Sequence, residues 1–258
     1  VVSADTTVNK LAGQNFTNTI SVGAKIYALP WMDVDLKYKN VNANEATTEI
    51  SPTLSNKFNA SISASVMDNL SLLADYELLN EENQKSSFSN YNNNINNGIV
   101  SITWYTPDSK YSVGLNGGLE IGKSNADLFF GVGGYGQTAP YTGIRDNAPF
   151  EHTSYYGSLN GRAILTSDVS LNASCGVTKT DGTTKVTYLD DKITTGDTIS
   201  EVLPVKVLNY FASLGVNYSI IKDAAASLSY SYSNWDDSVA DENDGAYHLV
   251  SLNLAYKF

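Results

Sequence analysis

Apolar and polar residues alternate with a period of two along most of the chain. The C-terminal segment shows this best, because Val250, Leu252 and Leu254 share one parity while Ser251 and Asn253 share the other. Successive side chains of a β-strand point to opposite faces of the sheet, so this alternation predicts strands with one apolar and one polar face.

The pattern recurs upstream and predicts an all-β chain. Weak strands are expected near 3–11 and 138–146. Firmer ones are expected near 17–28, 31–40, 55–66, 70–80, 97–105, 110–122, 126–136, 152–166, 169–179, 205–221, 224–235 and 247–258. The sheet then has 12 strands if both weak segments fail and 14 if both hold. Apolar residues spaced three and four apart are not sustained anywhere, which argues against amphipathic helices.

The connections between the expected strands are of two kinds that largely alternate along the chain. Tight turns are expected at 67–69, 106–109, 167–168 and 222–223, and long polar loops at roughly 40–55, 80–97, 137–152, 179–204 and 235–246. Short turns at one end and long loops at the other are typical of membrane β-barrels.

The chemistry of the two faces also favours a membrane. The polar face carries mostly Ser, Asn, Gly and Thr with few charges, which suits a water-filled lumen. The other face carries Leu, Val, Ile and Ala, with aromatic residues toward the strand ends, as expected beside lipid. Backbone groups in lipid must all be paired, so we expect a closed antiparallel transmembrane β-barrel formed by residues 1–258 as a single domain.

The last ten residues, LVSLNLAYKF, resemble the terminal strand of Gram-negative outer-membrane β-barrel proteins. In that group the last residue is typically Phe and every second residue before it is apolar or aromatic, a pattern read by the insertion machinery. The matching positions here are Val250, Leu252, Leu254, Tyr256 and Phe258. The resemblance implies an outer-membrane location and a size similar to the smaller porin-like channels of 12 to 14 strands.

Composition narrows the remaining options. The net charge of −11 argues against nucleic acid as a partner, and one cysteine, Cys175, cannot form an internal disulfide. Cys175 shares the apolar parity of Leu171 and Val177, so it is expected to face lipid. No Cys–His spacing indicates a metal site, and no cofactor is expected.

Two glycine-rich strings imitate nucleotide-binding motifs. Residues 117–124, GGLEIGKS, match the phosphate-loop pattern, and residues 131–136, GVGGYG, match the dinucleotide pattern. Both motifs require a helix after the glycines, and none is predicted here. We therefore interpret both strings as parts of strands, where glycines mark bends or bulges.

His152 and His248 are the remaining candidates for catalysis, as bases paired with a serine. No nucleophile motif accompanies either, so we interpret both as interfacial or loop histidines, and no enzymatic activity is expected.

Charged residues with the parity of the polar face are the candidate pore-lining residues. In a pore such charges set ion selectivity, whereas the alternative is that they form cross-strand ion pairs that brace the wall. The candidates are Lys25, Asp33, Asp35, Lys37, Lys39, Asp75, Glu77, Glu120, Arg162 and Lys257.

The sequence therefore predicts a porin-like channel of the bacterial outer membrane, open to passive diffusion of small hydrophilic solutes or ions. Its expected partners are outer-membrane lipid, those solutes and the insertion machinery. The alternatives are a structural or adhesive barrel that acts through extracellular loops, an outer-membrane enzyme, and a soluble sugar-binding β protein. The solute and the oligomeric state do not follow from the sequence.

Overall fold

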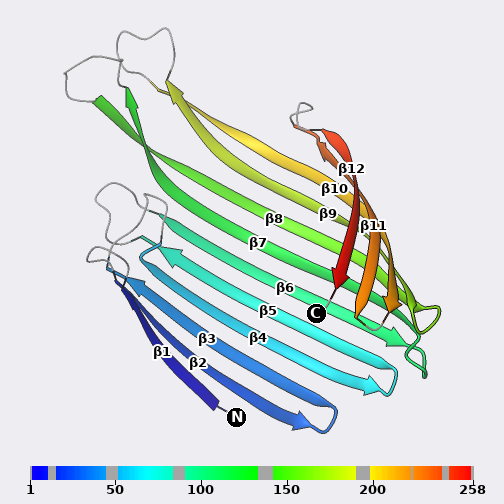
Figure 1. The fold of residues 1–258 in the computed structure, drawn as a ribbon. Helices are drawn as coiled ribbons and strands as arrows, with labels where there is room; N and C mark the ends of the chain where they lie inside the picture. The colour runs from blue at the N-terminus through cyan, green and yellow to red at the C-terminus, as the bar shows by residue number, and fades with distance from the viewer. Residues whose placement is uncertain are drawn as a thin grey trace.

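The chain folds into one antiparallel sheet whose strand order follows the sequence (Figure 1). The computed structural model describes residues 2–10, 16–44, 52–83, 91–132, 142–189, 198–221, 223–239 and 244–256. The strands are β1 (Val2–Lys10), β2 (Phe16–Leu29), β3 (Met32–Ala43), β4 (Leu54–Met67), β5 (Leu70–Glu82), β6 (Asn92–Tyr105), β7 (Tyr111–Val132), β8 (Thr142–Ile164), β9 (Val169–Leu189), β10 (Thr198–Ile221), β11 (Ala224–Asp237) and β12 (Gly245–Tyr256). These ranges contain no helix long and apolar enough to cross a membrane.

The all-β antiparallel prediction is confirmed, but two predicted strand breaks are wrong. The segments expected near 110–122 and 126–136 form one strand, β7, and those near 138–146 and 152–166 form one strand, β8. The weak segment near 3–11 is β1. Because two pairs of the fourteen predicted segments each form a single strand, the sheet has twelve strands.

The predicted loops 137–152 and 179–204 are also largely strand. β7 pairs with β8 without interruption from Tyr111–Ala163 to Val132–Thr142, and β9 pairs with β10 as far as Leu189–Thr198. These strands have 21 to 24 residues, about twice the length that spans a bilayer. Figure 1 shows their ends projecting past the neighbouring strands. In the sequence of these ends apolar and polar residues no longer alternate, for example at the consecutive residues Leu128, Phe129 and Phe130, although the backbone pairing continues.

The predicted tight turns at 67–69, 106–109 and 167–168 are confirmed, whereas residue 222 of the turn expected at 222–223 lies outside the described residues. In the turn between β6 and β7, the Thr106 hydroxyl donates a hydrogen bond of 2.6 Å to Asp108 Oδ1, and the Lys110 amide donates one of 3.2 Å. These bonds lower the pKa of Asp108, because they stabilise the ionised carboxylate. Ser109 adopts a positive φ of 55°, which closes the turn.

The sheet is a single layer with almost no hydrophobic core. Among the described side chains only Ala64 is a buried hydrophobic residue. Large apolar residues are instead exposed along one face, for example Ile26, Val100, Leu115, Leu214 and Leu252. A soluble protein does not leave so large an apolar surface exposed, so this face needs a nonaqueous neighbour.

The apolar residues form a band that runs obliquely to the strands. A row of directly opposed residues starts at Tyr38 in β3, continues through Phe58 and Leu78, and ends at Asp181 in β9 and Lys206 in β10. The residues of this row are therefore apolar and inside the band on β3 to β5, but charged and beyond the band on β9 and β10. Strands that tilt relative to a membrane plane produce this offset.

The terminal strand has the two faces that the sequence predicts. Val250, Leu252, Leu254 and Tyr256 are exposed on one face of β12. They lie opposite Tyr230, Leu228, Ala226 and Ala224 of β11. Phe258 and Lys257 lie outside the described residues.

The two edges of the sheet are β1 and β12 (Figure 1). The ladders between described residues join each strand to its neighbours in sequence, and none of them joins β1 to β12. Closure of the barrel stays a prediction, founded on the need to pair every backbone group in lipid.

Arginine at Leu252 or Leu254 should destabilise the protein in a bilayer much more than arginine on the opposite face. The two leucines are 66% and 74% exposed on the apolar face. Leu252→Arg or Leu254→Arg should cost roughly 2–4 kcal/mol near the bilayer midplane. Ser251→Arg and Asn253→Arg are the matched controls and should be much milder. Urea unfolding in phospholipid vesicles measures the difference, and equal costs on both faces would contradict the assignment.

Disulfide trapping tests closure. In a Cys175→Ser background, Thr6→Cys of β1 should form an intramolecular disulfide when combined with Val250→Cys, Leu252→Cys or Leu254→Cys of β12. Paired strands bring opposed Cα atoms within the 4.4–6.8 Å that a disulfide requires. Mass and electrophoretic mobility without reductant give the readout. Crosslinks only between two chains would show that another copy completes the barrel.

Candidate solute-lining wall

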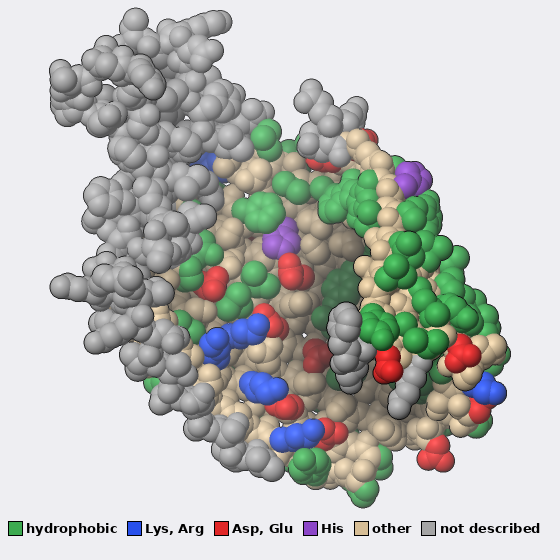
Figure 2. Space-filling view, in the orientation of Figure 1, with side chains coloured by type: hydrophobic (Ala, Val, Ile, Leu, Met, Phe, Trp, Pro, Cys, Tyr) green, Lys and Arg blue, Asp and Glu red, His purple; other side chains and the backbone are tan. Residues whose placement is uncertain are grey.

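The concave face of the sheet is the candidate functional surface. Figure 2 looks into this hollow, where basic and acidic side chains gather over the early strands. Strand parity places nine predicted pore-lining residues on this face, namely Lys25, Asp33, Asp35, Lys37, Lys39, Asp75, Glu77, Glu120 and Arg162. Their role in a pore stays a prediction.

Several of these charges form ion pairs on strands β2 to β5. Lys25 Nζ lies 2.7 Å from Asp33 Oδ2, and Lys37 Nζ lies 3.3 Å from Asp35 Oδ2. Glu77 Oε2 lies 2.7 Å from Nζ of Lys57 on β4. Lys25–Asp33 and Lys57–Glu77 are cross-strand ion pairs of the kind that braces a wall, whereas Lys37 and Asp35 lie on the same strand, β3.

Three predicted residues lack an ion pair within the described part of the chain: Lys39, Asp75 and Arg162. Lys39 lies directly opposite Lys57, an arrangement of like charges that is unfavourable by itself. Arg162 lies far from the early strands, on β8.

Large side chains of β8 lie over glycines of β7 in the middle of the wall. Asn160, Tyr156 and His152 are directly opposite Gly114, Gly118 and Gly122, and each occupies the space that a glycine Cβ would need. The repeat of one glycine in four residues therefore has a packing function. It also accounts for the phosphate-loop string at 117–124, which lies entirely within β7, so the strand interpretation of that string is confirmed.

The environment of His152 differs from the expected one. This residue lies within β8 on the concave face, rather than in a loop. Its Nε2 is 3.0 Å from Glu120 Oε1, and its ring stacks on Phe150 at a centroid distance of 5.1 Å. His248 instead lies on the outward face of β12, with Nδ1 2.7 Å from the Tyr230 hydroxyl.

Small polar side chains line the wall from β8 to β11. Ser174 and Ser213 share a hydrogen bond of 2.7 Å between their hydroxyl oxygens, and Asn217 donates one of 3.4 Å to Ser170. The wall borders a cavity of about 810 Å³ that includes Arg162. Small hydroxyl groups leave room for water at this side of the hollow.

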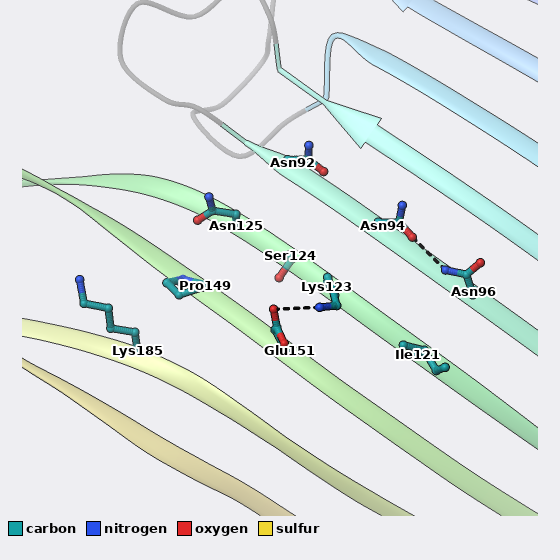
Figure 3. A pocket seen from close by; sticks show the side chains of 10 residues that line it. All are labelled: Asn92, Asn94, Asn96, Ile121, Lys123, Ser124, Asn125, Pro149, Glu151 and Lys185. Atoms are coloured by element: carbon teal, nitrogen blue, oxygen red, sulfur yellow. Dashed lines mark hydrogen bonds and ion pairs between the residues drawn. The ribbon is translucent and has the colours of Figure 1, made fainter.

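A separate polar cluster lies on the outward face, just beyond the apolar band. Lys123 Nζ lies 3.2 Å from Glu151 Oε1, and the Asn96 side-chain amide donates a hydrogen bond of 2.9 Å to Asn94 (Figure 3). These residues border a cavity of about 690 Å³. Strand register puts them on the same face as Ile121, so they mark the level at which β6 to β8 leave the lipid.

No group of His, Cys, Asp and Glu within the described ranges could hold a metal ion. Cys175 is exposed and shares its face with Val177, as its parity predicts.

Lys57, Tyr105 and Tyr156 also lie on the concave face, although they are not among the residues predicted from the sequence. The parity of each strand contains the signal, because Lys57 has the parity of Asn59 and Ser61. The ion-pair partners could not be found in this way, since they depend on the register between strands.

Comparison with known proteins identifies the fold. The siderophore receptor PirA from Acinetobacter baumannii matches with a TM-score of 0.65 and 11% identity, covering 98% of this chain. The ferric-catecholate import receptor Fiu from E. coli matches with a TM-score of 0.56 and 10% identity, covering 90% of this chain. No family model and no curated protein matches the sequence.

The chain has the fold of an outer-membrane β-barrel. The matches span 40% of PirA and 45% of Fiu, so this chain corresponds to less than half of either receptor. The fold and the exposed apolar band support the location predicted from the sequence, the bacterial outer membrane.

A methyl group at Gly118 should disturb the wall, whereas one at Gly117 should not. The Gly118→Ala variant places a Cβ in the Tyr156 ring, and overpacking of this kind costs about 1–3 kcal/mol. The neighbouring Gly117 faces outward, where a Cβ would meet its nearest atom, the Tyr156 carbonyl oxygen, at 3.8 Å. Urea unfolding in vesicles should separate the two variants. Equal stabilities would show that the Tyr156 ring does not depend on Gly118.

Proposed function

We propose that the protein is a porin-like channel through which small hydrophilic solutes or ions diffuse passively across the outer membrane. The supporting observation is the contrast between the two faces of one sheet. The outward face of β10 and β11 exposes Leu214, Tyr230 and Leu228, whereas the concave face carries serines and asparagines. With lipid outside, this concave face borders water.

The size of the lumen follows from the strand number. A barrel of eight strands is filled by its own side chains, and the interior widens as strands are added. Twelve strands lined by small residues such as Ser213, Gly215 and Ser229 leave a hydrated passage. The wall carries charges of both signs, many of them paired, so the expected ion selectivity is modest.

Conductance in planar bilayers tests this function. The purified, reconstituted chain should give discrete current steps in simple salt. Their absence over a range of voltages would overturn the channel proposal. If steps occur, Arg162→Gln should change the ratio of anion to cation permeability, and an unchanged ratio would remove Arg162 from the pore-lining residues.

A bulky residue on the concave face should narrow the passage. Gly215 faces inward, and a Cβ there would meet its nearest atom, Ser229 Cβ, at an ordinary 3.7 Å, so Gly215→Trp should be tolerated. The variant should lower the single-channel conductance. The preceding residue, Leu214, faces lipid. Leu214→Trp is therefore the matched control and should leave the conductance unchanged. Equal conductances for both variants would mean that β10 does not border the ion path.

A receptor-like function in solute uptake is the second candidate. PirA is named as a siderophore receptor and Fiu as a ferric-catecholate import receptor. The structural likeness to both extends over most of this chain. A receptor binds its ligand without giving open-channel current, so bilayer recordings distinguish it from a porin. An adhesive barrel acting through its loops would give neither current nor solute binding within the wall.

A further inference from the structure

A single row of opposed residues crosses the concave face from β6 to β11. Tyr105 lies opposite Ser112, and Ser112 lies opposite Arg162. The row then continues through Asn172, Gly215 and Ser229. All six residues border the cavity of about 810 Å³. Adjacent strands are about 4.8 Å apart, so a ligand of about 10 Å at Arg162 reaches both flanking strands.

Arg162 provides the charge of this row. Its guanidinium forms no ion pair with a described carboxylate, in contrast to the ion-paired Lys25, Lys37 and Lys57 of the early strands. The cross-strand neighbours of Arg162 are Ser112 and Asn172, which carry no charge. A planar guanidinium without an acidic partner is suited to bind a carboxylate or phosphate through two parallel hydrogen bonds.

The residues around Arg162 supply hydrogen bonds of another kind. Hydroxyl and carboxamide groups donate and accept, so they match the hydroxyl groups of a sugar. Tyr105 adds an exposed aromatic ring at one end of the row. None of the six residues in the row is buried, and Gly215 has no side chain. The wall therefore has space beside it for the ring of a small sugar.

We propose that this wall is a binding site for small anions that carry several hydroxyl groups, with sugar acids as the chemical class. The anionic group binds Arg162, and the hydroxyl groups bind Ser112, Asn172 and the neighbouring serines. The site rests on the proposed function, because the solute reaches it only if the concave face borders water. It makes this part of the passage selective for hydroxylated anions.

Equilibrium binding to the detergent-solubilised full chain tests the site without requiring conductance. Calorimetric titration with D-glucuronate should show saturable binding, weaker binding of acetate, which lacks the hydroxyl groups, and weaker binding of glucose, which lacks the charge. Arg162→Gln should reduce glucuronate affinity about 10- to 100-fold, the range expected for a lost charge-assisted hydrogen-bond pair. Lys123→Gln removes a cation from the outward face and is the matched control, with unchanged affinity expected.

The outcomes separate the site from the channel. Equal glucuronate binding by Arg162→Gln and the unchanged protein would overturn the site, and so would equal affinity for acetate and glucuronate. Current steps without glucuronate binding would also overturn the site while supporting the channel. Glucuronate binding that depends on Arg162, without current steps, would support the site and contradict the channel.

Discussion

The structure depends on one constraint: a sheet without a hydrophobic core must obtain its apolar environment from outside. Ala64 is the one buried hydrophobic residue among the described side chains, and most of the large exposed hydrophobic residues form a band on the outward face. Lipid against this band replaces the missing second layer. Backbone groups within lipid must then be paired along every strand, which explains the continuous antiparallel ladders from β1 to β12.

The same constraint leaves the concave face free to be polar. Side chains there need no hydrophobic partner, so small hydroxyl groups can line β8 to β11 and ion pairs such as Lys25–Asp33 can brace the early strands. Where larger residues occupy the wall, they lie over glycines, as Tyr156 lies over Gly118. The wall therefore has three parts. Ion pairs brace the early strands, large side chains of β8 pack over glycines of β7, and small polar residues border the cavity that contains Arg162.

The sequence was a good guide where strands cross the lipid and a poor one elsewhere. Alternation located β2, β11 and β12, because one side of each strand is apolar. It divided β7 and β8, because polar residues such as Lys123, Ser124 and Asn125 interrupt the alternation in the sequence while the backbone ladder continues. Parity assigned Lys25 and Arg162 to the concave face. It could not reveal that Lys25 is paired and that Arg162 has no acidic partner among the described residues, because side-chain contacts depend on the register between strands.

Labelling of single cysteines in a bilayer tests the central claim most directly. In a Cys175→Ser background, a membrane-impermeant, water-soluble maleimide should modify Ser229→Cys and Ser231→Cys in lipid vesicles, because both residues face the hollow. Leu228→Cys and Tyr230→Cys, their neighbours in β11, should be protected by lipid and react only after unfolding. Equal labelling of all four positions in the folded protein would contradict a sheet with water on one side and lipid on the other.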